Sequence, residues 1–384
     1  MQISKLSGEQ IKDPIYQSSG NKSITSLSTV YDGPTIVYLD EKIGHLQTNE
    51  VESIDKYYDE QYQFFNESEE DDILYKIEKD RKIFRQQHQV ETLMAKVDLQ
   101  HGMQILDYGC AKGTVLKRMH AQRPDINPYL FDVSTTYTHL WQKFLTVDHY
   151  ASYQPKKEWA GKFDLITSFF AFEHTPDPLK ELSTIRDLLK EGGLVYLIVP
   201  NVFENVGDFI VADHVHHYSE ISLRYMLAKA GFETLEIDTT SHFAAFIIIG
   251  KKKSGEQVTF SADKSELEKT NTEFKKIAAY WEGIQLKILE FENALKYSPA
   301  AIYGAGVYGN FIGTTLRDSD KIECFIDQNP LLQGKKILNK PVFMPNEIPS
   351  HIKVIYVGLN PKIAKNAMSK LQAEKANNLS FVYL

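Results

Sequence analysis

The alternation of apolar and polar positions predicts three kinds of structure in succession along the chain. Between about residues 84 and 252, short apolar runs alternate with helix-like patterns. Such alternation is typical of an α/β fold, in which helices cover a mostly parallel sheet. A charged linker then leads into a long stripe of apolar residues spaced by three and four positions, and a shorter α/β pattern follows it.

The apolar runs of the first α/β region predict a sheet of about seven strands, whose last two strands form a closing pair. Glycines and prolines mark the ends of the helices Leu179–Leu189 and Ile221–Gly231. The predicted strands are Met103–Asp107, Tyr129–Asp132, Val147–Tyr150, Phe163–Phe170, Leu194–Pro200, Phe232–Ile237 and Phe243–Ile249.

These patterns divide the chain into four parts. Residues 1–83 are predicted to wrap around another domain, 84–252 to form the larger α/β domain, 253–298 to be a linker with a long amphipathic helix, and 299–384 to form a small Rossmann-like domain. The helical stripe runs from Leu267 to Leu295. It either packs on the chain's own domains or joins two copies, so we expect a monomer or a homodimer.

The N-terminal part carries one strand-like run, at Thr35–Leu39, and little chemistry of its own. The segment Ile54–Phe65 is predicted to be a helix with Tyr58 and Tyr62 on one face, and Ile73–Val97 continues as an amphipathic pattern. The aromatic face either docks the helix on the core or closes over a cofactor or substrate.

The stretch Met103–Gly113, MQILDYGCAKG, predicts a strand, a glycine turn and a helix. A dinucleotide turn needs a middle glycine where this chain has Ala111, and Asp107 would repel a diphosphate. An acid suits a ligand with an ammonium and a sulfonium, so the stretch predicts a site for S-adenosylmethionine. The residues expected to form it are Asp107, Gly109, Cys110 and Gly113.

Three further residues are candidates for cofactor binding. Asp132 ends the second strand about 20 residues beyond the turn, where a carboxylate accepts ribose hydroxyls, although the same acid also suits a helix cap or a surface turn. Asp148 is the candidate for the adenine amino group at the end of the third strand. Phe169 lies in the fourth strand, FDLITSFF.

The most reactive segment is Asp213–Ser219, DHVHHYS, because it combines three histidines with an acid. A histidine is well suited to remove the proton from the group that accepts the methyl. We expect His214, which lies beside Asp213 in the sequence, to be this base, with His174 as the second candidate. Two alternatives remain: the histidines bind loop backbone, or a metal binds Asp213, His214 and His216.

Other residues are predicted to contact the acceptor. In a parallel sheet, ligands bind beyond the carboxyl ends of the strands, where Glu173 and Asn201 lie. His217 belongs to the reactive loop and is a further candidate.

The motifs LDYGCAKG, FDVS, FDLITSFFAFEHTPDP, LLKEGGLVYLIVPN and LRYMLAKAGFE together resemble a class I S-adenosylmethionine-dependent methyltransferase. The resemblance covers roughly Phe84 to Lys252. It implies a Rossmann-like seven-stranded sheet and a methyltransferase that uses S-adenosylmethionine.

The C-terminal part has the complete three-glycine spacing that the first turn lacks. Gly304, Gly306 and Gly309 follow a short apolar strand, and Asp327 ends the next strand. The stretch AAIYGAGVYG, with Tyr308, predicts a nucleotide diphosphate site, or else a purely packed turn. A domain of about 85 residues is half a dinucleotide fold, which argues against hydride transfer.

The order of these domains, with YGAGVYGN, FIDQNPLLQGKKILNKPVFMP and IYVGLNPKIAKNAM, resembles the nucleotide-sugar C-methyltransferases. The resemblance implies a nucleotide-linked keto-sugar as acceptor, a terminal domain that holds its nucleotide, and an acid-histidine pair at Asp213 and His214. The chain departs from that family because residues 1–58 contain no cysteine and Val211 replaces a tyrosine. O- or N-methylation of another small metabolite, and a non-catalytic scaffold, therefore stay open.

Composition excludes several other classes. A net charge of -8 argues against nucleic acid as the main partner, since binding phosphates needs a basic face. Two distant cysteines favour a reducing compartment, and no apolar run is long enough to span a bilayer. We therefore expect a cytoplasmic protein with no membrane partner and no structural metal.

Overall fold

The fold is that of a computed structural model of the chain. The structure describes residues 2–50, 72, 74–78, 81–255, 258–294, 299–375 and 379–384. The predicted helix Ile54–Phe65, with Tyr58 and Tyr62, lies outside these residues.

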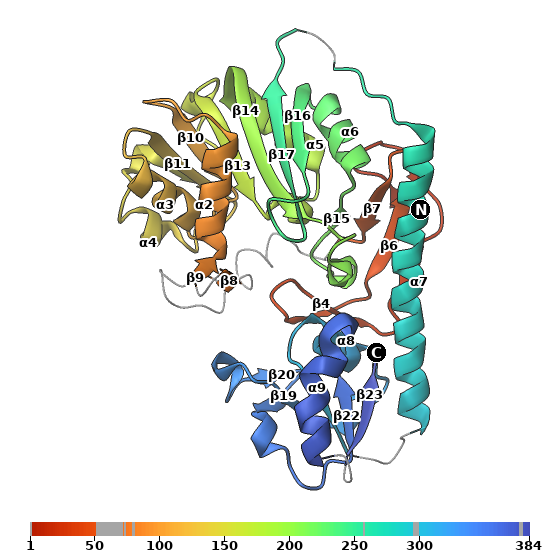
Figure 1. The fold of residues 1–384 in the computed structure, drawn as a ribbon. Helices are drawn as coiled ribbons and strands as arrows, with labels where there is room; N and C mark the ends of the chain where they lie inside the picture. Colours follow the sequence, from red (N-terminus) through yellow and green to blue (C-terminus); the bar gives the residue numbers. More distant parts are fainter. Residues whose placement is uncertain are drawn as a thin grey trace.

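A seven-stranded sheet forms the centre of the larger domain, as the sequence predicts (Figure 1). Its strand order is β12-β11-β10-β13-β14-β17-β16, and all neighbours are parallel except for the pairs that involve β17. The strands are β10 Gln104–Tyr108, β11 Asn127–Asp132, β12 Tyr150–Ser152, β13 Phe163–Phe169, β14 Leu189–Pro200, β16 Phe232–Asp238 and β17 Ala245–Lys252.

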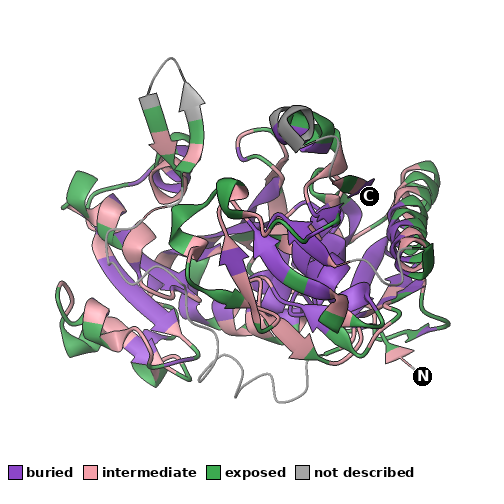
Figure 2. Ribbon diagram, turned by 90° about the horizontal axis from the view of Figure 1, so that it is seen from below, coloured by how far each residue is buried: buried purple, intermediate pink, exposed green. Residues whose placement is uncertain are grey.

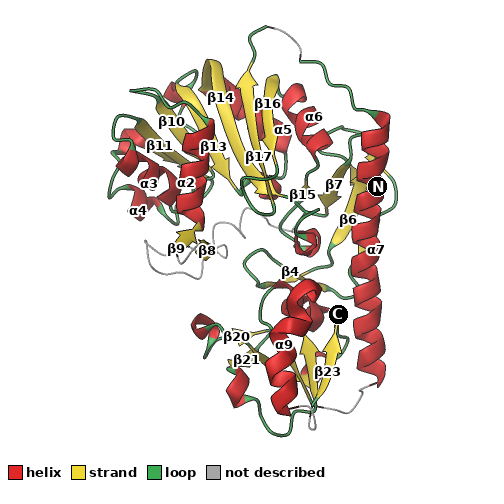
Figure 3. Cartoon of the chain, in the orientation of Figure 1, coloured by secondary structure: helices red, strands yellow, loops and turns green. Residues whose placement is uncertain are grey.

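Helices cover both faces of this sheet (Figure 3). Apolar side chains of α2, α3 and α4 share one core with the sheet, and those of α5 and α6 share a second core with its other face. Buried residues accordingly gather along the strands (Figure 2). The helices are α2 Arg85–Lys96, α3 Thr114–Gln122, α4 Thr138–Trp141, α5 Pro178–Leu188 and α6 Glu220–Lys229.

Two local predictions are wrong. Residues 74–78 and 81–84 pair as antiparallel strands, β8 Leu74–Glu78 with β9 Arg81–Phe84, where the sequence predicts a helix. The helix begins only at Arg85 because the Asp72 carboxylate accepts the backbone N–H groups of Gln86 and Gln87.

The second correction concerns the predicted third strand. Residues Val147–His149 form a 3-10 turn, and the strand β12 starts at Tyr150. The turn is closed by a hydrogen bond from the His149 backbone N–H to the Thr146 carbonyl, which takes these residues out of the sheet.

The N-terminal part forms a small sheet that includes a strand from the reactive loop. The strand order is β15-β7-β6-β3, and the loop contributes β15. A separate hairpin, β4 with β5, lies between this sheet and the C-terminal domain (Figure 1). The strands are β1 Gln2–Ile3, β2 Gln10–Ile11, β3 Tyr16–Gln17, β4 Lys22–Ile24, β5 Val30–Asp32, β6 Ile36–Asp40, β7 His45–Thr48 and β15 His216–His217.

The long predicted helix is α7, Lys264–Ala294, and it runs along the side of the molecule past both domains (Figure 1). Its apolar stripe includes Phe274, Trp281 and Ile288, which are buried in one core with the N-terminal sheet and the C-terminal domain. The stripe therefore packs on the chain's own domains.

The C-terminal domain is a second, smaller Rossmann-like unit. Its six-stranded sheet has the order β20-β21-β19-β18-β22-β23 and is parallel except for the β20-β21 pair. None of the described helices is both long and apolar enough to cross a membrane. The elements are β18 Ala300–Tyr303, α8 Val307–Thr315, β19 Ile322–Ile326, β20 Lys336–Ile337, β21 Lys340–Phe343, β22 Val354–Val357, α9 Pro361–Lys375 and β23 Ser380–Tyr383.

Candidate active site

The glycine turn after β10 has the tight geometry that the sequence predicts. Gly113 has φ +70°, a left-handed backbone conformation that strains any residue with a Cβ, and a Cβ there would also lie 2.6 Å from a methyl group of Leu130. The Ala111 backbone N–H donates to Oδ2 of Asp132 over 2.7 Å. The turn and the end of β11 are thereby joined, and Asp132 keeps further lone pairs for ribose hydroxyls.

Asp107 is buried at the carboxyl side of β10 and accepts a hydrogen bond of 3.0 Å from the Thr167 hydroxyl. Burial raises the pKa of Asp107 to about 7, the Asp132 charge adds to this effect, and the Thr167 hydrogen bond opposes it. Among the residues that the structure describes, no basic side chain pairs with Asp107, so its carboxylate would gain from a bound cation, which fits the ammonium of S-adenosylmethionine.

The remaining cofactor candidates have different surroundings. Asp148 is exposed in the 3-10 turn before β12, at the amino end of a strand whose carboxyl end lies beside Asp132. Asp148 was expected to bind adenine because it would lie at the carboxyl end of this strand, and the structure does not place it there. Phe169 ends β13 and is half-buried, and Cys110 is buried in the glycine turn.

The carboxylate that binds His214 is Asp208, and not the neighbouring Asp213 as predicted. Nδ1 of His214 donates to Oδ1 of Asp208 over 2.6 Å, and Nδ1 of His217 donates to Oδ2 over 2.8 Å. All three side chains are buried. One carboxylate therefore fixes the orientation of two imidazoles.

The position of Asp208 depends on the long helix. Asp208 lies in a 3-10 segment, η5 Val206–Ile210, and the Trp281 indole N–H donates 2.7 Å to the Val206 carbonyl at its start. The α7 helix thus holds the segment that carries the carboxylate.

The charges in this cluster shift its pKa values strongly. Burial opposes a charge on His214, but the Asp208 carboxylate outweighs burial, and the pKa of His214 rises to about 9. Burial would raise the pKa of Asp208, yet His214 and His217 hold it well below its usual range. At neutral pH the resting pair is an imidazolium beside a carboxylate.

Asp213 instead joins the reactive loop to the N-terminal part. It accepts hydrogen bonds of 2.7 Å from both the backbone N–H and the hydroxyl of Ser26, and it lies 3.8 Å from Nδ1 of His174. Its side chain is fully buried. Asp213 is therefore a positioning residue for the loop, and its assignment as the partner of His214 is wrong.

Glu173 and His174 lie in a 3-10 turn directly after β13, beside His214, as their place beyond a strand end predicts. Burial raises the pKa of Glu173 to about 8, whereas the positive charge of His214 opposes this shift. Burial, together with the His214 charge, lowers the pKa of His174 to about 4, so this ring is neutral at pH 7.

The N-terminal sheet supports the loop from behind. His217 accepts a hydrogen bond of 3.2 Å from the Thr48 hydroxyl through Nε2, while Nδ1 binds Asp208. Both ring nitrogens of His217 are therefore occupied, and its prediction as an acceptor-binding residue is wrong. Asn201 is buried at the end of β14 and accepts the Phe203 backbone N–H through Oδ1.

The glycines of the C-terminal turn, residues 304–309, have different surroundings. A Cβ at Gly304 would lie 2.4 Å from the Gly358 carbonyl oxygen, so Gly304 is required for packing. A Cβ at Gly306 would meet nothing within 4 Å. Tyr308 stacks on Trp281 with ring centroids 5.3 Å apart, which makes it a packing residue of the α7 interface.

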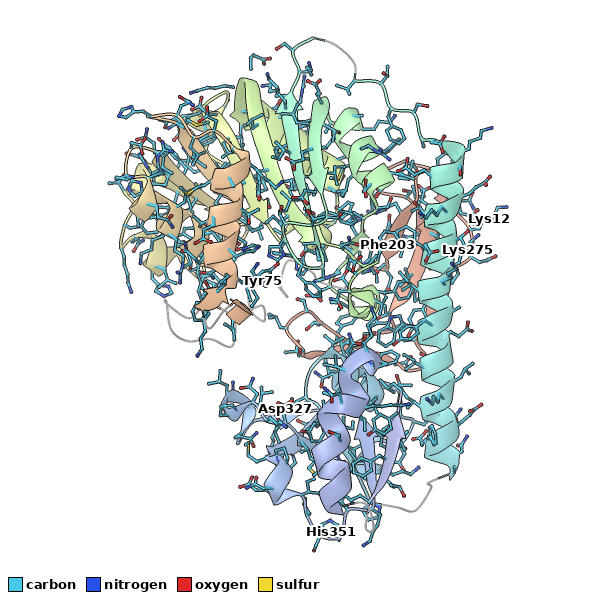
Figure 4. The ribbon with its side chains drawn as sticks, viewed as in Figure 1. Lys12, Tyr75, Phe203, Lys275, Asp327 and His351 are labelled. Carbon is cyan, nitrogen blue, oxygen red and sulfur yellow. The ribbon has the colours of Figure 1, made fainter. Side chains whose placement is uncertain are left out.

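Asp327 repeats the geometry of Asp132. Its Oδ2 accepts the Ala305 backbone N–H over 2.8 Å, as Oδ2 of Asp132 accepts that of Ala111. Asp327 lies on the side of the C-terminal domain that faces the seven-stranded sheet domain, whereas His351 lies at its far end (Figure 4).

A cavity of about 1130 Å³ opens between the hairpin β4-β5 and the C-terminal turn. Its walls include Gly306 and Asp327, which were predicted to bind substrate, but not Gly304 or Tyr308. More basic than acidic side chains line the cavity. The charged residues that line it are Lys22, Arg317, Lys335, Lys336, Asp32 and Asp327.

Asp208 and Ser26 are functional residues that the sequence patterns do not predict. Asp208 carries a weak signal, because an acid within the apolar run GDFIVAD needs a buried partner. No pattern in the sequence distinguishes Ser26 from the other serines of its segment.

Comparisons with known proteins agree with this geometry. Residues 80–237 match the model of a family described as "Methyltransferase domain". The ubiquinone biosynthesis O-methyltransferase of Aromatoleum aromaticum is 27% identical over 157 residues, which are 35% of this chain and 66% of that one. The enzyme of the same name from Xanthomonas campestris is 31% identical over 110 residues, which are 26% of this chain and 44% of that one.

Among solved structures, an S-adenosylmethionine-dependent methyltransferase from Mesorhizobium loti has a TM-score of 0.36 at 13% identity and covers 43% of this chain and 98% of its own. The chain spans between 40% and 66% of the length of the curated relatives it matches. The match to the family model, the strand order of the sheet and the glycine turn after β10 all indicate the same type of domain. Residues 80–237 therefore belong to a class I S-adenosylmethionine-dependent methyltransferase domain.

Proposed function

We propose that the chain methylates a nucleotide-linked sugar, with its nucleotide in the cavity beside Gly306 and its acceptor atom beside His214. The observation that carries the proposal is the turn of the β4-β5 hairpin. Ser26 in this turn binds Asp213 of the reactive loop, and the Ser28 carbonyl accepts a hydrogen bond of 3.2 Å from Asn310 of the C-terminal domain. A five-residue turn, 25–29, thus contacts both sites.

The chemistry of the cavity supports a diphosphate. Four of its six charged side chains are basic, and Gly306 precedes the N-terminus of α8, where backbone N–H groups favour an anion. The volume exceeds that of a typical small-molecule pocket and accommodates a ligand of nucleotide-sugar size.

We infer that His214, in the neutral form of its imidazole, removes the proton from the acceptor atom. S-adenosylmethionine supplies the methyl group, as a sulfonium that reacts by in-line displacement. Asp208 holds the His214 ring through Nδ1, so Nε2 is the nitrogen that faces a ligand. The resulting imidazolium is stabilised by Asp208, whose charge already raises the pKa of His214. C- and O-methylation both need this proton transfer.

A second candidate is an O-methyltransferase acting on another small metabolite. It is favoured by the names of the curated relatives, which are ubiquinone biosynthesis O-methyltransferases over the matched region. This candidate assigns no ligand to the C-terminal cavity.

A calorimetric titration separates the two. The protein is titrated with S-adenosylhomocysteine, and then with UDP, dTDP and GDP in its presence. We expect stoichiometric binding of one of the nucleotides, followed by methyl incorporation into the corresponding nucleotide sugar. Cofactor binding with no nucleotide binding would contradict the proposal and favour the second candidate.

A further inference from the structure

Three side chains beside the proposed acceptor site have the geometry of a metal site. Glu173, His174 and His214 each offer one ligand atom, and these atoms all lie within 4.8 Å of one another. The set of two histidines and one carboxylate is a common ligand set for Zn²⁺ that leaves a coordination position open.

The two imidazoles are held in the way that metal-binding histidines require. Nδ1 of His214 donates to the Asp208 carboxylate over 2.6 Å, and Nδ1 of His174 donates to the Asp213 backbone carbonyl over 2.8 Å. In metal sites, such acceptors fix the tautomer and turn Nε2 toward the ion. Their rings are nearly perpendicular, with centroids 4.7 Å apart, so they approach a common point from different directions.

Glu173 supplies the independent observation. Its side chain is 1% exposed, and its Oε2 atom has no hydrogen-bond partner among the described residues. A buried carboxylate oxygen without a partner is costly, and a cation at this position would satisfy it.

The surrounding charge also favours a cation. Glu173, Asp208 and Asp213 are all at least nineteen-twentieths buried, and Asp208 lies within ion-pair distance of both His214 and His217. A divalent ion at this point would bring positive charge beside these three desolvated acidic groups.

We propose that Glu173, His174 and His214 bind a divalent transition cation such as Zn²⁺, and that the bound cation blocks methyl transfer. The block follows because the cation occupies the His214 nitrogen that accepts the proton. This second part rests on the proposed function, whereas the binding itself does not.

This site differs from the metal set considered from the sequence. Only His214 is common to both sets. Asp213 accepts two hydrogen bonds from Ser26, and His216 shares a hydrogen bond of 2.9 Å with His45 on the N-terminal sheet.

The test uses the full chain, treated with a chelator and titrated with Zn²⁺ alone at pH 7.5. We expect one equivalent to bind with a micromolar or lower dissociation constant, and Glu173→Gln and His174→Asn to weaken binding at least tenfold. His351→Gln is the matched control, because it removes a surface histidine whose Nε2 lies 2.6 Å from Glu323. Stoichiometric binding that is lost in His351→Gln but kept in Glu173→Gln would overturn the site, as would the absence of binding.

Two further measurements keep the inference testable if a variant fails to fold. Co²⁺ bound to the unmodified chain should give the visible absorption of a four- or five-coordinate site, and octahedral spectra alone would contradict it. Zn²⁺ should inhibit methyl transfer in proportion to occupancy and leave S-adenosylhomocysteine affinity unchanged. Zn²⁺ binding without inhibition would support the metal site and contradict His214 as the proton acceptor. If His214→Ala loses activity but the unmodified chain binds no Zn²⁺, the result would support His214 as the proton acceptor and contradict the metal site.

Discussion

Oδ1 of Asp208 lies 2.6 Å from Nδ1 of His214, six residues further along the chain. The same carboxylate binds His217 through its other oxygen. Because Asp208 is buried and its position is set by α7, the orientation and charge of His214 depend on an element far from the cofactor turn. This relationship makes the proposed proton acceptor sensitive to changes at a residue that touches no substrate.

Replacing His214 with Ala should lower turnover about a hundredfold or more, because the proton would then have no acceptor. Affinity for S-adenosylhomocysteine should stay nearly unchanged, since His214 is proposed to act on the acceptor and is not among the residues predicted to bind the cofactor. Methyl transfer and calorimetry check the two parts, and His351→Ala serves as the surface control. Unchanged turnover in His214→Ala would remove this residue from the mechanism.

The pH dependence of kcat/KM should report the pKa of His214. Only the neutral imidazole accepts a proton, and the folded-state pKa is about 9, so activity should rise with pH and level off above about pH 9. In Asp208→Asn the carboxylate no longer outweighs burial, so the midpoint should move to lower pH while the maximal rate falls. A midpoint that is the same in both proteins would contradict the role of Asp208.

Binding of S-adenosylhomocysteine should weaken in acid because of Asp107. Its pKa is about 7, so the fraction that carries a negative charge falls from about nine-tenths at pH 8 to about one-tenth at pH 6. If the ionised form binds the ligand ammonium, the affinity should be about tenfold lower at pH 6. Calorimetry at the two pH values checks this, and Asp107→Asn should bind weakly and with no pH dependence. A pH effect that persists in Asp107→Asn would assign it to another group.

Replacing Gly306 with Glu should raise the KM for a nucleotide sugar about tenfold or more. The new side chain has room, since a Cβ there meets nothing within 4 Å, and its charge would repel a phosphate at the start of α8. Gly283→Glu is the matched control, because this exposed glycine of α7 also has open space around it. Equal KM values for the two variants would argue against a diphosphate in the cavity.

Removing the Ser26 hydroxyl should destabilise the protein. Ser26→Ala deletes one of the two hydrogen bonds that Ser26 donates to the buried Asp213 carboxylate, which corresponds to about 1.5 to 3 kcal/mol of unfolding free energy. Urea unfolding measures the change. Ser254→Ala removes a hydroxyl that binds the exposed Glu191, and it should have almost no effect. Equal stability of both variants would show that the Ser26 contact is not stabilising.

The sequence by itself determined the seven-stranded sheet, the cofactor turn and the long helix. These features depend on local periodicity, on Gly109 and Gly113 in the turn and on acids that end strands, all of which a single sequence shows directly. For the same reason the predictions for Glu173 and His174 beyond the end of β13 agree with the structure.

Only the tertiary structure decided which groups meet in the reactive loop. Adjacency in sequence favoured Asp213 as the partner of His214, but Ser26, from a segment 187 residues earlier, binds Asp213, and the 3-10 segment η5 brings Asp208 to His214 instead. The same packing pairs both ring nitrogens of His217 with protein groups, and it stacks Tyr308, which was predicted beside the nucleotide, on Trp281. A side chain's partner is set by the long-range packing of backbone segments, which periodicity in a single sequence does not encode.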